Sequence, residues 1–151
     1  MAATWAVSDN KSDTAFWLER LNQTAPVVRV FVRIKGSGAR DLIDLQLQMI
    51  GSDMTKVPGY EREVNGHLAV VEAVAMGVAD IGMAHASAAV ALGLDFIPLQ
   101  KEESVLLVPR SLLDLPRIQQ MLDVLNTSRF LRELRALGPY DTLHTGQLIR
   151  K

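Results

Sequence analysis

Apolar and polar positions alternate most clearly at residues 27–34, where the sequence reads VVRVFVRI. Valine or isoleucine occupies every second position, which is the period-two pattern of a half-buried strand. The glycine-rich residues 35–38 come next, and apolar positions at helical spacing then continue to Ile50, where Gly51 ends the pattern. The sequence therefore predicts a strand, a glycine turn and a helix over residues 27–50.

The rest of the chain repeats this alternation of strands and helices. Helices are predicted at 13–22, 68–76 and 84–92. Two further helices are predicted near the end of the chain: the first has Pro116 in its first turn and continues to Leu125, and the second is capped by Thr127 or Ser128 and ends before Gly138. Strands are predicted at 60–64, 79–83, 94–99 and 104–108. The small and polar residues 1–13 predict a loose segment, and the tail from Tyr140 is predicted to be irregular. Strands that alternate with helices indicate βαβ units, so the fold class is α/β, with a mainly parallel sheet and helices on both faces.

Composition supports a globular chain with a real core. The 151 residues are 48% apolar and 22% charged, which corresponds to one ordinary domain. No linker, repeat or low-complexity stretch interrupts residues 27–140. We therefore divide the chain into an N-terminal extension with a short helix, residues 1–26, and one α/β domain, residues 27–151.

Charge and cysteine content exclude several classes of function. Sixteen basic and seventeen acidic residues leave a net charge of −1, which favours neither nucleic acid nor an acidic membrane as partner. The absence of cysteine excludes disulfides, thiol catalysis and cysteine-based metal sites. The sequence has no run of 18 apolar residues and therefore predicts no membrane span. Its first residues do not resemble a secretory signal. We expect a cytoplasmic protein.

The turn KGSGAR holds the sharpest candidate chemistry. Glycines let the backbone approach a ligand, and the helix that follows offers free N–H groups and a positive dipole end. A hydroxyl and two cations add donors, so the predicted ligand is an oxyanion or a carboxylate; the residues are Lys35, Gly36, Ser37, Gly38 and Arg40. Neither the P-loop nor the GxGxxG pattern is present. An equally weighted alternative is a plain tight turn with a capping serine.

Histidines supply the remaining candidates. His67 follows Asn65-Gly66 at the start of a predicted helix, where it would donate to a ligand in the same cleft. The favoured alternative makes Asn65 an N-cap and His67 a partly buried first-turn residue. His85 follows a predicted strand, but no GxSxG elbow accompanies it, and His67, His85 and His144 are too dispersed for a recognisable metal signature. We predict no enzyme, no metal site and no cofactor.

An ordered set of motifs carries a family resemblance. The set is GSGxR at 36–40, HLAVxxAVAxGxADxG at 67–82, ALGLDFIPL at 91–99 and GxYDT at 138–142. Over residues 29–149 the chain resembles the periplasmic-binding-protein-like (class II) domain, of the type appended to molybdopterin molybdotransferase and helix-turn-helix proteins. That branch is associated with molybdate handling and molybdenum cofactor enzymes. The resemblance implies that the chain corresponds to the second lobe of this normally two-lobed fold.

The resemblance implies a function and a set of binding residues. It implies a non-catalytic module that binds a small oxyanion such as molybdate or tungstate, or a molybdenum cofactor-related ligand, in sensing or metalloenzyme maturation. The ligand-facing residues that carry over are Ser37, Gly38, Arg40, His67, Tyr140, Asp141 and Thr142. The alternative is an accessory interaction subunit of an oxidoreductase without a ligand of its own. In either case the expected partner is a second copy or another protein.

Overall fold

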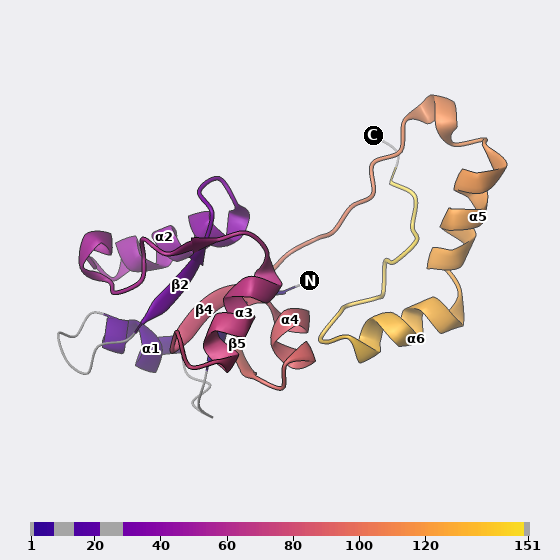
Figure 1. The fold of residues 1–151 in the computed structure, drawn as a ribbon. Helices are drawn as coiled ribbons and strands as arrows, with labels where there is room; N and C mark the ends of the chain where they lie inside the picture. Colours follow the sequence, from indigo (N-terminus) through magenta and orange to yellow (C-terminus); the bar gives the residue numbers. More distant parts are fainter. Residues whose placement is uncertain (1, 8–13, 22–28, 150–151) are drawn as a thin grey trace. The chain divides into compact units, whose positions relative to one another are not determined.

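We describe the fold from a computed structural model, which describes residues 2–7, 14–21 and 29–149 (Figure 1). The chain forms two compact units, Ala2–Lys101 and Glu102–Lys151, and each is described by itself. The predicted division between an extension, 1–26, and a domain, 27–151, stays a prediction. No helix among the described residues is long and apolar enough to cross a membrane.

A five-stranded mixed sheet forms the centre of the first unit. Its strands are β1 (Ala2–Val7), β2 (Val30–Arg33), β3 (Glu63–Val64), β4 (Ile81–His85) and β5 (Asp95–Lys101), in the order β3-β2-β4-β1-β5. Strand β2 runs parallel to both β3 and β4. Strand β1 runs antiparallel to both β4 and β5. The parallel part of the sheet is therefore β3-β2-β4.

Strand β1 corrects the prediction that residues 1–13 are loose. Ala2–Val7 lie between β4 and β5, and Trp5 is opposite Met83 on one side and Ile97 on the other. The segment AATWAV does not alternate apolar with polar residues, so its own pattern gave no strand signal. Its pairing comes from two neighbouring strands that are far away in sequence. Residues 8–13 lie outside the described residues.

Helices cover both faces of the sheet, as the α/β pattern predicts. They are α1 (Thr14–Leu21), α2 (Gly38–Met49), α3 (His67–Ala75) and α4 (Ala86–Ala91), with a 3₁₀ turn at Met54–Lys56. Buried side chains of α2 pack with Val30 and Val32 of β2, whereas those of α3 pack with Phe31 of the same strand. Because successive strand residues point to opposite faces, α2 and α3 lie on opposite sides of the sheet. The predicted fold class is confirmed.

Gly82 in β4 allows α3 to approach the sheet closely. A Cβ built at Gly82 would lie 2.4 Å from Cγ1 of Val70, whose side chain is fully buried. We expect Gly82→Ala to lower the free energy of unfolding by about 1–3 kcal/mol through overpacking. Denaturant unfolding measures the change. The control is Gly38→Ala, where the added carbon meets nothing within 4 Å; equal stability of the two variants would contradict this packing.

The second unit is built around two helices. These are α5 (Pro116–Leu125) and α6 (Ser128–Ala136), preceded by a 3₁₀ turn at Arg110–Leu112. Pro116 lies in the first turn of α5, and Thr127 caps α6 by accepting a hydrogen bond from the backbone N–H of Phe130 at 3.2 Å. Both helices were predicted from their spacing.

The predicted strand at 104–108 is absent from the structure. Residues 102–109 form neither helix nor strand, and no ladder within the described chain includes them. The apolar run SVLLV has strand propensity, but a strand also requires a neighbouring backbone with which to pair. The prediction was therefore wrong for the single chain.

Candidate functional site

The candidate site lies where the parallel strands β2 and β4 end. These strands are neighbours in the sheet, yet the chain leaves them in opposite directions. From β2 it passes through α2 to β3 on one side, and from β4 it passes through α4 to β5 on the other side. Ligands of open α/β sheets bind at such a switch point, outside the carboxyl ends of the strands. Arg33 ends β2 and His85 ends β4.

The turn between β2 and α2 is a capped helix start. The Ser37 hydroxyl donates to the carbonyl oxygen of Ile34 at 2.8 Å and accepts from the backbone N–H of Arg40 at 3.3 Å. Gly36 has a φ of +80°, a conformation that glycine adopts without strain. Lys35, Gly36 and Gly38 are exposed and Ser37 is partly buried. The turn thus has the capping serine of the alternative interpretation, and its role in ligand binding stays a prediction.

Arg40 is buried and already surrounded by partners. Its Nε lies 3.0 Å from Oδ1 of Asp44, and its Nη1 lies 3.0 Å from Oε1 of Glu63. The guanidinium also lies 4.0 Å from the centre of the Tyr60 ring, and the Tyr60 hydroxyl donates to Asp44 at 2.6 Å. These contacts join α2 to β3 and to the turn before it. The geometry therefore gives Arg40 a structural function; its predicted contact with a ligand stays a prediction.

His67 and Arg33 form the polar centre of the site. Arg33 ends β2, and its Nη1 lies 2.9 Å from Nε2 of His67, the first residue of α3. A guanidinium has only hydrogen-bond donors, so Nε2 of His67 must be the acceptor of this contact. The imidazole then carries its proton on Nδ1, and this assignment follows from the chemistry of the pair.

Two buried atoms of this pair have no hydrogen-bond partner in the structure. They are Nε of Arg33 and Nδ1 of His67. With the tautomer set by Arg33, both atoms are N–H donors. A buried donor without an acceptor costs about 1–3 kcal/mol, and more when it is charged. Within the described residues, the site therefore presents two buried N–H donors that have no acceptor.

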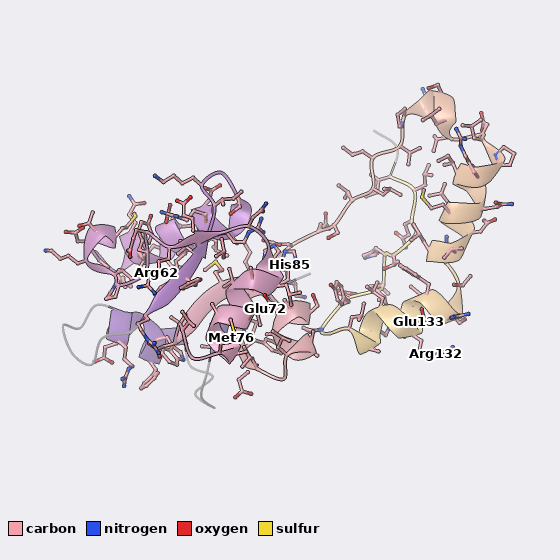
Figure 2. The ribbon with its side chains drawn as sticks, in the orientation of Figure 1. Arg62, Glu72, Met76, His85, Arg132 and Glu133 are labelled. Carbon is pink, nitrogen blue, oxygen red and sulfur yellow. The ribbon has the colours of Figure 1, made fainter. Side chains whose placement is uncertain are left out.

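His85 completes the cluster. Its ring stacks on that of His67, with centroids 3.6 Å apart and planes inclined by 22°. Figure 2 labels His85 at the end of β4, beside the start of α3. Burial lowers the pKa of His67 to about 4, and the charges of His85 and Arg33 contribute to the lowering. His67 is therefore neutral at pH 7 and acts as a neutral donor beside the Arg33 cation.

The lowered pKa of His67 predicts a loss of stability in acid. The unfolded chain, with a histidine pKa of 6.5, binds the proton more readily than the folded chain, whose pKa is about 4. The stability that the neutral His67 ring contributes to the folded chain is thus complete above pH 6.5, and it is lost as the pH falls toward 4. Because the ring is only partly buried, we expect the free energy of unfolding to fall by about 1–2 kcal/mol over this pH range. Thermal unfolding of the wild type and His67→Gln from pH 7 to 4 measures it.

The control for this pH dependence is His144→Gln. His144 is exposed and its Nδ1 lies 3.1 Å from Oε1 of Gln147. We expect this variant to retain the acid sensitivity of the wild type and His67→Gln to lose part of it. Identical pH profiles for all three proteins would show that His67 is not the group responsible.

Three predicted site residues belong to the second unit. The Thr142 hydroxyl is buried and accepts from Nε of Arg135 at 2.8 Å, while Oδ1 of Asp141 accepts from the backbone N–H of Leu143 at 3.0 Å. The backbone N–H of Tyr140 donates to Gly138 at 2.8 Å. These contacts shape a local turn after α6, and a ligand role for Tyr140, Asp141 and Thr142 stays a prediction.

Arg33 is the site residue that the sequence analysis missed, and His85 was considered only for catalysis or metal binding. A usable signal existed, because Arg33 lies at the end of one predicted strand and His85 closely follows another, and each of these strands runs into a helix. Among the described residues, no three His, Cys, Asp or Glu side chains gather in a way that could hold a metal ion.

Comparison with known proteins identifies the family. A family model described as the PBP superfamily domain matches residues 7–126. The chain belongs to the PBP superfamily. The fold described above is consistent with one lobe of such a protein. The narrower resemblance, to domains appended to molybdotransferases and helix-turn-helix proteins, stays a prediction.

Two bacterial proteins are similar in sequence to this PBP superfamily chain. One is an uncharacterized protein in the 5′ region of a ferredoxin 2Fe-2S gene of Clostridium pasteurianum, 35% identical over 109 residues; the match covers 72% of this chain and 96% of the relative. The other is the uncharacterized protein YvgK of Bacillus subtilis (strain 168), 36% identical over 126 residues. That match covers 81% of this chain but only 39% of YvgK. No solved structure matches the chain.

Proposed function

We propose that this PBP superfamily chain is a non-catalytic module that binds a small oxyanion at the carboxyl ends of β2 and β4. The observation that carries the proposal is the pair of buried donors without partners, Nε of Arg33 and Nδ1 of His67. An oxyanion supplies several acceptor oxygens and no donor, so it is the kind of ligand that such donors bind. Membership in the superfamily supports a ligand-binding function.

Local electrostatics favour an anion at this site. Arg33 carries a full positive charge, and α3 begins at His67 with its positive dipole end beside that charge. Gly66, the N-cap of α3, supplies no side-chain hydrogen bond to the first turn. Free N–H groups at a helix start are a known means of binding anions. The net charge of the chain is −1, so attraction depends on this local arrangement.

The proposed ligand is molybdate, tungstate or a molybdenum cofactor-related anion. The sequence resemblance supports this ligand class, and the proposed role is sensing or metalloenzyme maturation in the cytoplasm. A tetrahedral oxyanion has acceptors on every side, which suits a site whose identified groups are donors. Lys35 and the backbone of Gly36–Gly38 are exposed at the adjacent turn and are proposed as further contacts.

Isothermal calorimetry with a panel of ligands tests the proposal. The panel is molybdate, tungstate, sulfate, phosphate and a nucleotide, each titrated into the whole chain at pH 7. We expect saturable binding of at least one oxyanion, and a rise in melting temperature that grows with its concentration. No binding of any oxyanion by the wild type would contradict the proposal.

A second candidate function is that of an accessory interaction subunit of an oxidoreductase. The observation that favours it is the exposed apolar run Val105–Leu107 in the second unit. The Clostridium pasteurianum relative is encoded in the 5′ region of a ferredoxin gene. This position is consistent with a relative that acts together with a redox protein. A partner protein bound equally well with and without oxyanion would favour this candidate over the first.

A further inference from the structure

The stack of His85 on His67 joins the end of β4 to the first turn of α3. Further along both elements, Gly82 of β4 has no side chain, and a Cβ built there would clash with Cγ1 of Val70 on α3. His67 precedes Val70 by about one helical turn, and His85 follows Gly82 by three strand positions. The close approach of α3 to β4 thus continues to the site, where the two imidazole rings meet.

The direction of the Nδ1 donor of His67 depends on how its ring is held. The χ2 torsion of histidine has broad, roughly two-fold minima, so the ring by itself has no single orientation. A half-turn of the ring about χ2 would exchange Nδ1 with a carbon atom and move Nε2 away from Arg33. The 2.9 Å contact between Nη1 of Arg33 and Nε2 of His67 therefore selects one of the two orientations.

A single hydrogen bond still leaves the plane of the His67 ring free to tilt about that contact. His85 restrains this second motion, because its ring lies against a face of His67 with centroids 3.6 Å apart and planes inclined by 22°. A tilt of the His67 ring would separate the two faces and lose this stacking contact. Arg33 and His85 together therefore fix the direction in which Nδ1 of His67 points.

We propose that His85 is a positioning residue for anion binding: the flat face of its ring holds the His67 ring so that the Nδ1–H donor keeps one direction. This inference rests on the proposed function, because it concerns how the same site presents one of its two buried donors. His85 acts through the face of its ring and does not itself contact the anion. A donor that is already oriented binds without the loss of freedom that a mobile side chain suffers.

Substitutions of His85 separate the face of the ring from its nitrogen atoms. His85→Phe keeps a flat aromatic face and removes both nitrogens, whereas His85→Gln keeps polar groups and removes the ring. We expect His85→Phe to bind molybdate and tungstate within about twofold of the wild type, and His85→Gln to bind them about 3- to 10-fold more weakly. His85→Leu, which also lacks a flat face, should behave like His85→Gln. Calorimetric titration of the whole chain at pH 7 measures these affinities.

Nitrogen-detected NMR of the free variants gives a second reading that needs no ligand. In the wild type and in His85→Phe, His67 should show two well-separated ring signals, one from a protonated Nδ1 and one from an unprotonated Nε2. In His85→Gln and His85→Leu the two signals should move toward each other, because a ring that is free to leave Arg33 populates both tautomers. A loss of stability alone would not change the tautomer of His67 in the folded chain.

Equal affinities and equal His67 signals in His85→Phe and His85→Gln would overturn the proposal. Weaker binding by His85→Phe than by His85→Gln would also overturn it, because the nitrogen atoms of His85 would then be the part of the ring that binding requires. A wild type that binds no oxyanion would contradict the proposed function, and the NMR comparison would still decide whether His85 positions the His67 ring.

Discussion

Replacing Arg33 with methionine should lower the affinity for the bound oxyanion by about 100-fold. Arg33 supplies a full positive charge to the cluster and one of its two buried donors without a partner. A hydrogen bond from a charged group contributes about 1.5–3 kcal/mol, which corresponds to a 10- to 150-fold change in affinity. Calorimetric titration of molybdate or tungstate measures the loss.

The stability of this variant should remain within about 1 kcal/mol of the wild type. Methionine removes the hydrogen bond from Nη1 of Arg33 to His67, but it also removes the buried Nε donor that has no partner, and the two effects offset each other. Arg62→Met is the matched control, since the Arg62 side chain is 58% exposed and lies in the same unit. We expect the control to bind like the wild type. Equal affinities of the Arg33 and Arg62 variants would show that the anion binds elsewhere.

Replacing Arg40 with methionine should lower the free energy of unfolding by about 2–4 kcal/mol. The Arg40 side chain is only 4% exposed and contacts both Asp44 and Glu63 at 3.0 Å. Its removal leaves two carboxylates without their cation and an empty space against the Tyr60 ring. Breaking a buried ion pair from one side is costly, although the partial exposure of both carboxylates moderates the effect here. Urea unfolding measures the change.

Arg29→Met is the control for this prediction. Arg29 contacts Asp80 at 2.8 Å, so the ion pair is as short, but the Arg29 side chain is 47% exposed. An exposed ion pair contributes about 0–1 kcal/mol, so this variant should lose little stability. If the free energy of unfolding fell by the same amount in both variants, burial would not explain the contribution of Arg40 to stability.

Local patterns were sufficient for most of the fold. The alternation at residues 27–34 and the glycine turn after it correctly predicted β2 and the start of α2. The Thr127 cap and the spacing of Phe130 and Leu134 likewise predicted α6. These elements can be read from sequence because their periodicity and their end signals lie within a few residues of each other.

The failures involve contacts between distant residues. Ala2–Val7 form a strand because their backbone pairs with β4 and β5, which are more than 70 residues away in sequence. Residues 104–108 have a strand pattern but no such edge in the described chain. Arg33 and His67 are 34 positions apart, and only the pairing of β2 with β3 and β4 brings them together. Arg40 shows the same limit, since the carboxylate of Glu63 that neutralises it is 23 positions away.

The most direct test of the central claim is to follow His67 by nitrogen-detected NMR while tungstate or molybdate is added. The free protein should show a neutral ring protonated at Nδ1 with a pKa of about 4. Binding of an anion beside this ring should shift its Nδ1 signal and raise that pKa by about one unit or more, because a nearby negative charge favours the protonated form. The signals of His144 serve as the internal reference. A His67 ring that is protonated on Nε2, or whose signals and pKa stay unchanged at saturating anion, would contradict the account.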